Sequence, residues 1–302
     1  MEEKREFQGK VWASKPYKVF QFFNFVALAL IGLACFLPIV HIFAISLSSM
    51  APIARNEVTF WPVEFTTLAY EYVLRNAAFW TAMRVSVVRT VLGLGVNLLF
   101  TILVAYPLSK ENDVFPARTR YVFFFFFTML FSGGIIPLFI VVRWTGLIDT
   151  IWALVLPGAV GVFNVILMLN FFRQLPKELT EAAHMDGAGH VRTLISVILP
   201  CSAASIATVS LFIMVFHWNE WFTPIIFMNR HTNYPLQTFL RSLLIDQAFQ
   251  ITSLEDVELL NRLSNRTIVS AQTFVGMLPI LVVYPFLQKH FTKGVVLGSV
   301  KG

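Results

Sequence analysis

Several stretches of this 302-residue chain are predominantly apolar over more than about 20 consecutive positions, the length that an α-helix needs to cross a bilayer. The composition agrees with membrane insertion. Apolar residues make up 57% of the chain and charged residues 13%, whereas about a quarter of the residues in a typical soluble domain are charged. The sequence therefore predicts an all-α integral membrane protein.

Six of the apolar stretches are long enough to be membrane spans. They cover approximately residues 19–45, 81–106, 121–142, 151–172, 194–218 and 268–288. The first is too long for the apolar core of a cleavable signal peptide and lacks a small-residue cleavage site, so we expect it to remain as an anchor. Since no polar stretch is long enough to form a second core, we predict one six-helix transmembrane domain over 19–288, with polar tails at 1–18 and 289–302.

Two of the predicted spans contain residues that interrupt a plain apolar helix. Gly133, Gly134 and Pro137 predict a kink or break in the outer half of the third span. Arg84 and Arg89 lie near the start of the second span, and a charge at the bilayer centre costs roughly 2.5–3.5 kcal/mol on insertion scales. We expect these arginines to face water, a polar cavity or lipid headgroups, and snorkelling is favoured over contact with a substrate.

Lysine and arginine are unevenly distributed between the two sets of loops. The richer set holds 14 of these residues and comprises 1–18, 108–120, 173–193 and 289–302. The poorer set holds 7 and comprises 46–80, 143–150 and 219–267. Because cytoplasmic loops carry the excess of Lys and Arg, we predict a multi-pass protein of the cytoplasmic membrane with both termini inside. Topology thus accounts for the net charge of +6, and no nucleic-acid partner is indicated.

The polar stretch between the fourth and fifth spans has more internal order than a plain loop. Pro176 lacks an N–H and suits the first turn of a new helix, and Gly187 accepts the left-handed conformation that ends one. Between them, Leu179, Ala182 and Ala183 have the spacing of one helical face. We predict a short helix with a small-residue face, followed by a tight turn, which together form a docking element.

The same stretch resembles a known family. It reads Glu181-Ala182-Ala183, then Asp186-Gly187-Ala188, then Ile198-Leu199-Pro200, which is similar to the EAA loop of ABC importer permeases. The resemblance implies a type I ABC importer permease fold (MetI-like, maltose-type), in which 176–193 is a coupling loop that sits in a groove of a separate ATPase subunit. The implied coupling residues are Glu181, Ala182, Ala183, Asp186, Gly187 and Ala188. This family often has a proline shortly after the Leu-Pro, where this chain has Cys201-Ser202-Ala203-Ala204, so the local bend of the following helix stays open.

The second half of the chain extends the resemblance. It contains His217-Trp218-Asn219-Glu220-Trp221-Phe222, then Pro235-Leu236-Gln237, and ends with Lys293-Gly294 and Gly298 to Gly302. These segments are similar to the smaller permease of the maltose-type carbohydrate branch, whose tail can reach toward the ATPase interface. Aromatic side chains suit sugar faces, so four residues are candidates for the substrate path: Trp218, Asn219, Trp221 and Phe222. An interfacial aromatic belt would have the same pattern.

The sequence contains no recognisable catalytic motif. It has neither a Gly-x-x-x-x-Gly-Lys-Ser/Thr phosphate loop nor a Gly-x-Ser-x-Gly nucleophile motif, and its six histidines lack metal-ligand spacing. Cys35 and Cys201 lie in predicted spans, where we expect packing roles and no disulfide. We predict a non-enzymatic subunit without cofactor or metal, and the resemblance implies that ATP and Mg²⁺ are bound by the partner ATPase.

These observations predict the permease subunit of an importer that moves a carbohydrate, in particular an oligosaccharide, by alternating access. The resemblance implies four kinds of partner: a second related permease in a heterodimer, two ABC ATPase subunits, an extracytoplasmic sugar-binding protein and membrane lipid. The outer loops 46–80 and 219–267 are the candidates for contact with the binding protein, and Ser253 in the latter predicts a helix start. An ion-coupled secondary transporter and an ABC permease for a non-sugar substrate such as peptides remain alternatives.

Overall fold

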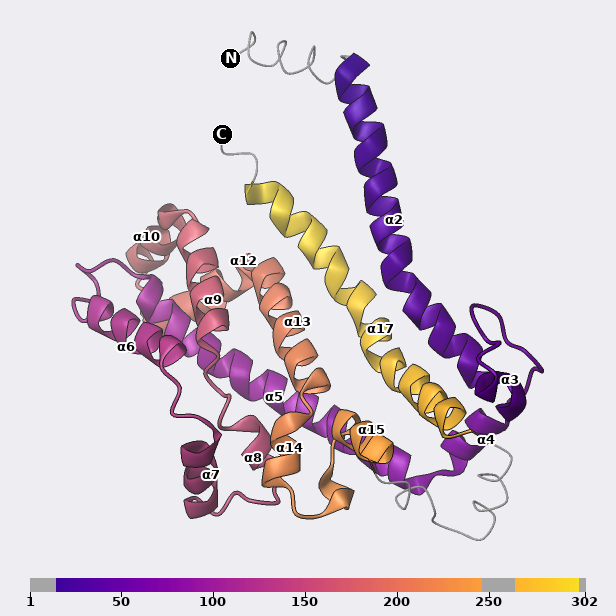
Figure 1. Ribbon diagram of the computed structural model, residues 1–302. Helices are drawn as coiled ribbons and strands as arrows, with labels where there is room; N and C mark the ends of the chain where they lie inside the picture. The colour runs from indigo at the N-terminus through magenta and orange to yellow at the C-terminus, as the bar shows by residue number, and fades with distance from the viewer. Residues whose placement is uncertain (1–14, 246–263, 299–302) are drawn as a thin grey trace. The chain divides into compact units, whose positions relative to one another are not determined.

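The computed structural model describes residues 15–245 and 264–298, and every regular element in these ranges is a helix (Figure 1). The chain divides into two compact units, one of Met1–Arg75 with Ile251–Val275 and the other of Asn76–Gln250 with Gly276–Gly302. The helix start predicted at Ser253 lies outside the described residues.

The first unit is built on one long apolar helix. Helix α2 (Lys15–Ser46) coincides with the first predicted span. The loop predicted at 46–80 is not irregular throughout, because it contains the short helices α3 (Met50–Ala54) and α4 (Leu68–Arg75). A small core of Ala44, Ile45, Ile53 and Val58 fixes the end of α2 against α3.

The second unit is organised around helix α5 (Ala77–Ser109), which contains the second predicted span. The helix begins at Asn76, whose side chain accepts a hydrogen bond of 3.0 Å from the N–H of Phe79 and so supplies a partner for one free donor of the first turn. Helices α9 (Val162–Gln174) and α13 (Ala203–Asn219) pack against α5. Their shared core consists of apolar side chains that include Ala105, Tyr106, Val165, Met168, Phe172, Ile198, Val209 and Ile213.

The third predicted span is broken, as its glycines indicated. Helix α6 (Arg118–Leu130) ends before the Gly133-Gly134 pair, and α7 (Ile135–Trp144) continues at an angle of 112°. Gly134 has φ +84, a left-handed conformation that side-chain-bearing residues rarely adopt. The predicted break is therefore confirmed.

The fourth and fifth predicted spans differ from single helices. The fourth is divided into α8 (Trp152–Val155) and α9, with Pro157 and Gly158 in the gap. The fifth is bent by 83° between the segments His190–Cys201 and Ala203–Asn219. The first of these segments is a series of short turns: α11 (His190–Thr193), a π-helical turn (Leu194–Ile198) and α12 (Leu199–Cys201). The bend falls at Ser202, in the stretch where the sequence left the local course of the helix open.

By length and hydropathy, three described helices can each cross a membrane, and the two bent pairs raise the number to five. The three are Pro16–Ser46, Ala77–Ser109 and Asn265–Val283. The last belongs to α17 (Asn265–Gly298), which runs beyond the predicted end of the sixth span at 288. The sixth crossing would be the fourth predicted span, which is divided into α8 and α9, and α9 is a shorter apolar helix.

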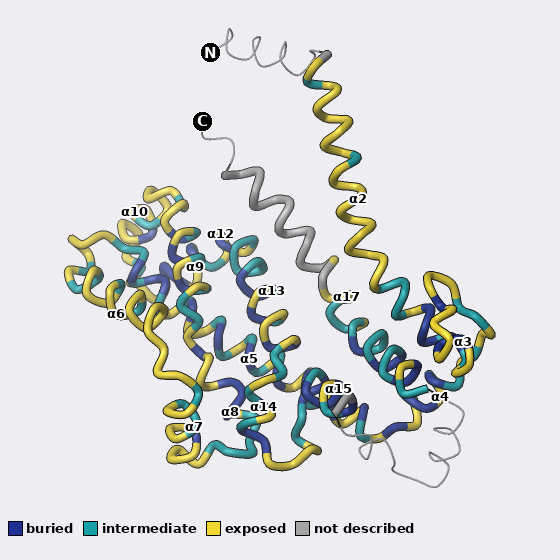
Figure 2. The backbone as a smooth tube through the Cα atoms, viewed as in Figure 1, coloured by how far each residue is buried: buried dark blue, intermediate teal, exposed yellow. Residues whose placement is uncertain are grey.

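Large apolar surfaces are left uncovered, as a membrane protein requires. Figure 2 shows α6 and most of α2 as exposed, and α6 has no buried residue at all. The exposed side chains of α6 include Phe123, Phe124, Phe126 and Phe127. These phenylalanines suit contact with lipid or with another apolar protein surface. Cys35 and Cys201 are also exposed, so the prediction that they are packing residues is wrong.

Helices α5 and α13 approach each other closely at Gly93. A Cβ atom at this position would lie 2.3 Å from His217 Nε2, so the imidazole occupies the space that a side chain would need. On the same helix, a Cβ atom at Gly95 would meet nothing within 4 Å. The two glycines therefore form a matched pair, one required by packing and the other not.

We expect Gly93→Ala to lower the free energy of unfolding by about 1–3 kcal/mol, because the added methyl group forces the His217 ring out of its site. Gly95→Ala should be neutral or stabilising, since alanine is the better helix former by roughly 0.5–1 kcal/mol. Thermal melting of the purified proteins in one detergent checks both. Equal melting temperatures for the two variants would contradict the packing role of Gly93.

Candidate functional site

The polar stretch after α9 folds as the sequence predicts. Helix α10 (Lys177–Met185) follows Pro176, which stands as its N-cap with φ −55, close to the angle that the proline ring imposes. Glu178 lies in the first turn, where a negative charge is favourable, and His184 lies in the last. The predicted short helix is confirmed.

The turn that ends α10 satisfies the last carbonyl groups of the helix. Gly187 has φ +77 and its N–H donates to the carbonyl of His184 at 3.0 Å. The N–H of Ala188 donates to the carbonyl of Ala183 at 2.9 Å, which is the reverse turn that a left-handed glycine makes possible. The His184 ring then contacts the carbonyl of Ala188 through Nδ1 at 3.0 Å and meets the His190 ring edge-on at 5.2 Å between centroids. The turn after α10 is thus held by backbone hydrogen bonds and by contacts of the His184 ring.

The predicted apolar face of α10 divides between the interior and the surface. Ala183 is buried at 8% exposure, whereas Leu179 and Ala182 are exposed. Two further apolar residues stand out on the same surface, Met185 at 88% and Val191 at 71% exposure. Sequence reasoning missed both, although an apolar residue at each end of a polar turn was a visible signal. We name Leu179, Ala182, Met185 and Val191 the docking surface.

Of the six predicted coupling residues, the structure places Glu181, Ala182, Asp186 and Gly187 at the surface. Ala183 packs inward, and Ala188 is partly buried and participates in the turn. The loop therefore exposes a surface of small and apolar side chains.

A groove of 480 Å³ lies beside α10, between it and the ends of α5 and α9. Its lining includes Tyr106 and Lys110, and the Lys110 ammonium lies over the Tyr106 ring at 4.5 Å from the centroid. Lys177 forms an ion pair across the groove with Glu111. The hydrogen bond and charge of Lys177 lower the pKa of Glu111, and those of Glu111 raise the pKa of Lys177. Because both groups are exposed, water screens this pair and it stabilises the fold little.

A second set of polar side chains lies at the C-terminal end of α13, the end that is farther along the chain from α10. Arg89 of α5 is buried at 1% exposure and pairs with Glu220, the residue that follows α13. Its Nη2 donates to Glu220 Oε2 at 2.7 Å and its Nη1 donates to the Glu220 backbone carbonyl at 2.9 Å. The guanidinium thus also supplies a donor to a backbone carbonyl at the C-terminal end of α13. Such a carbonyl lacks a partner within the helix, and a positive charge is favourable there.

The expectation that Arg89 snorkels to the headgroups is wrong. The sequence contained the partner, since Glu220 lies in the Trp-Asn-Glu-Trp segment, but a separation of 131 residues hides the pairing from any local pattern. Arg84, on the same helix, is exposed as expected.

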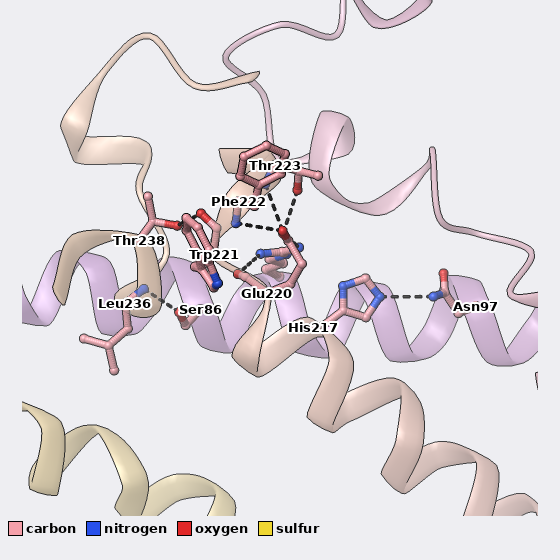
Figure 3. A network of polar contacts seen from close by, with 10 residues as sticks. Ser86, Asn97, His217, Glu220, Trp221, Phe222, Thr223, Leu236 and Thr238 are labelled. Carbon is pink, nitrogen blue, oxygen red and sulfur yellow. Dashed lines mark hydrogen bonds and ion pairs between the residues drawn. The ribbon is translucent and has the colours of Figure 1, made fainter. Parts of the chain in front are cut away.

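The carboxylate of Glu220 also organises the short helix that comes next, α14 (Phe222–Phe227). Oε1 accepts from the N–H groups of Phe222 and Thr223, each at 2.8 Å, and Oε2 accepts from the Thr223 hydroxyl at 2.6 Å (Figure 3). Together with the bond from Arg89, one carboxylate receives four hydrogen bonds. It joins α5, the end of α13 and the start of α14.

Helix α15 (Leu236–Ile245) is fastened to the same region. The N–H of Leu236 donates to Ser86 Oγ of α5 at 2.7 Å, and Thr238 Oγ1 donates to the carbonyl of Trp221 at 2.9 Å (Figure 3). The Arg241 guanidinium stacks on the Trp221 ring at 3.6 Å from the centroid. The segment 220–245 is therefore not a free loop, because α5 holds it at Ser86 and at Arg89.

The four candidate substrate-path residues are brought close together but face different surroundings. Trp218 is buried at 5% exposure, Trp221 is half-buried under Arg241, and Asn219 and Phe222 are exposed. Beside them, His217 Nε2 lies 3.1 Å from Asn97 Nδ2, a buried contact between α13 and α5 (Figure 3). Exposure favours Asn219 and Phe222 over Trp218 for direct contact with a ligand.

Asp149, between α7 and α8, orders the stretch after α14. Its Oδ1 accepts from Asn233 Nδ2 at 2.9 Å and from the N–H of Asn229 at 3.1 Å and Arg230 at 3.3 Å, and its Oδ2 pairs with the Arg230 guanidinium at 2.9 Å. Burial of the carboxylate raises its pKa, but the hydrogen bonds from Asn233, Arg230 and Asn229 and the charge of Arg230 outweigh it, so the pKa of Asp149 is lowered.

Comparison with known proteins adds to this geometry. The family model described as binding-protein-dependent transport system inner membrane component matches residues 98–297. The Bacillus subtilis polygalacturonan/rhamnogalacturonan transport system permease protein YtcP is 36% identical over 285 residues, 94% of this chain and 99% of that protein. Protein LplC of the same organism is 40% identical over 296 residues, 96% of this chain and 97% of that protein.

A solved structure is similar over almost the whole fold. It is the crystal structure of a bacterial ABC transporter involved in the import of the acidic polysaccharide alginate, and one of its chains superposes with a TM-score of 0.82 at 32% identity. The alignment covers 92% of this chain and 98% of that chain.

We expect Asp149→Asn to lower the melting temperature at neutral pH and to lose this effect in acid. The folded-state pKa of Asp149 lies below the unfolded value of about 3.9, so its stabilisation is complete above that pH and disappears as the pH falls through the folded value. Asparagine tolerates the φ of +62 at this position, which separates charge from backbone strain. Melting curves from pH 7 to pH 3 check this, with Asp113→Asn at an exposed site as the control. A difference that persists unchanged at the lowest pH would contradict it.

Proposed function

Because this chain belongs to the family of binding-protein-dependent transport system inner membrane components, we propose that it is the permease subunit of an ATP-binding-cassette importer for carbohydrate. The observation that carries the proposal is α10. It is a short helix held by a left-handed glycine turn, with an exposed docking surface, in the loop that the Lys and Arg distribution assigns to the cytoplasm.

A carbohydrate cargo is supported by the relatives that span nearly the whole chain. YtcP is described as a permease for polygalacturonan/rhamnogalacturonan, and the similar solved transporter imports alginate. These polymers have acidic sugar units, so the cargo of this chain is an oligosaccharide for which uronate-containing chains are the first to test.

The coupling residues receive force from a separate ATPase. Glu181, Ala182 and Ala183 form the middle of α10, and Asp186, Gly187 and Ala188 form the turn that fixes its end. ATP binding by two partner subunits, with Mg²⁺, draws the docking helices of this permease and of a second, related permease together. The spans then alternate between inward and outward openings, and this chain contributes no catalytic group. A partner can shift such an equilibrium only through contacts that differ between the two states, and we propose that the docking surface makes these contacts.

The other partners follow from the topology. With both termini and α10 in the cytoplasm, segments 46–80 and 219–267 face outward, where the sugar-binding protein delivers its cargo. Asn219 and Phe222, both exposed, stand at the start of the latter segment and are the proposed contacts for a sugar, whereas Trp218 is buried and Trp221 partly buried.

The direct test is import by the complete transporter in liposomes, with this permease, its partner permease, the ATPase and the binding protein. We expect uptake of labelled oligosaccharide to require ATP inside the vesicle and to be unaffected by protonophores or sodium ionophores. Uptake that follows an ion gradient would support a secondary transporter instead. A panel of neutral oligosaccharides, uronate oligosaccharides and peptides, tested by thermal shift of the binding protein, separates a sugar cargo from a peptide cargo.

We expect Gly187→Val to lower coupled uptake roughly ten-fold, because a β-branched residue at φ +77 carries a strain of about 1–2 kcal/mol that the turn can release only by moving. Gly187→Asn is the matched control, since asparagine tolerates the left-handed region and should retain most activity. Sugar-stimulated ATPase activity and uptake are measured together, with assembly of the complex checked by gel filtration. Normal stimulation in Gly187→Val would contradict the coupling role of this turn.

A further inference from the structure

One carboxylate stands where three helices meet. Glu220 follows the last residue of α13, accepts from the first N–H groups of α14 and pairs with Arg89 in the middle of α5. At 14% exposure for the Glu220 side chain and 1% for Arg89, neither charge has water as an adequate alternative partner. This pair therefore joins the three helices at one point, in addition to the apolar core that packs α13 against α5.

The next contacts extend the same junction outward. Ser86 lies one helical turn before Arg89 and accepts from the N–H of Leu236, the first residue of α15. Thr238 and Arg241 of α15 both hold Trp221. Segment 220–245 is thus bonded to α5 at Ser86 and at Arg89, and α15 holds Trp221 within the segment.

The same helix α13 continues in the other direction to the docking loop. It follows the bend at Ser202, and the turns before that bend, from His190 to Cys201, lead directly out of the turn that ends α10. One covalent path therefore runs from the docking surface through α13 to Glu220.

We propose that Arg89 and Glu220 are positioning residues for coupling: they lock the outer segment 220–245 to α5 and α13, so that displacement of the docking loop reaches the surface that meets the binding protein. This inference rests on the proposed function. The pair touches neither nucleotide nor cargo. It acts through α14 and α15, whose orientation it fixes.

The chemistry of the carboxylate defines a sharp variant. The Glu220 carboxylate only accepts hydrogen bonds, and its four donors are two backbone N–H groups, one hydroxyl and one guanidinium. Glu220→Gln keeps the size but replaces one accepting oxygen with an NH₂ group, so the donors on that side lose their acceptor and Arg89 loses its counter-charge. In case a lone buried arginine prevents assembly, the double variant Arg89→Gln/Glu220→Gln removes both charges. Arg84→Gln, at an exposed site on the same helix, is the matched control.

The experiment measures the ATPase activity of the complete reconstituted transporter with and without loaded binding protein. We expect basal activity to be retained in Glu220→Gln and in the double variant, while stimulation by the binding protein falls roughly ten-fold, in the range seen when a coupling network is interrupted. Arg84→Gln should be stimulated like the unaltered protein. A merely structural role would lower basal and stimulated activity in parallel, and that result would overturn the proposal.

A distance measurement tests the positioning directly. Spin labels at Val88 on α5 and Ile225 on α14, both exposed, report the junction after the exposed Cys35 and Cys201 are changed to serine. We expect a narrow distance distribution in the unaltered junction and a broad one in Glu220→Gln. An unchanged distribution, or full stimulation in Glu220→Gln while the unaltered transporter is stimulated, would overturn the inference alone. Absence of stimulation in the unaltered transporter would contradict the proposed function, and the inference with it.

Discussion

A charge inside a membrane helix must find a partner, and in this chain that requirement fixes the second unit. Arg89 lies well inside α5, where exposure to hydrocarbon would cost several kcal/mol. Its carboxylate partner comes from the far end of α13, so the two helices must lie side by side in one register. Removing one member of a buried pair typically costs about 3–5 kcal/mol, because the other charge is left uncompensated. The pair therefore specifies an arrangement more than it adds stability.

Two glycines support the arrangement in different ways. Gly93 lets the His217 ring lie against α5 one turn beyond Arg89, so the ion pair and the close approach enforce the same register. Gly187 has open space around it, and its role is conformational, since φ +77 closes the turn after α10. The first glycine is required by a neighbour and the second by its own backbone. This difference explains why only the second could be identified from sequence.

Local patterns predicted what local forces decide. The apolar runs located α2, α5 and α17, and proline and glycine located α10 and the break before α7. The bend at Ser202 was left open by the sequence, because no glycine or proline stands at that residue. The pairing of Arg89 with Glu220 was likewise hidden, since it joins residues 131 positions apart. In the candidate site, the helix and its turn followed from sequence, whereas the exposure of Met185 and the burial of Trp218 depend on tertiary packing.

The two proposed functional regions of this chain lie at opposite ends of one continuous segment, and different contacts hold each of them. The docking loop is held mainly by backbone geometry and leaves the side chains of its docking surface exposed, which suits the proposed contact with a partner. The outer segment is held by side-chain contacts: the Glu220 carboxylate and the Ser86 hydroxyl bond across to other helices, and the exposed Arg241 guanidinium stacks on Trp221. A junction of that kind resists gradual deformation, because any displacement breaks charged hydrogen bonds in a dry environment. We therefore expect movement that enters at α10 to be transmitted as the motion of a rigid segment, without being absorbed at the end of α13.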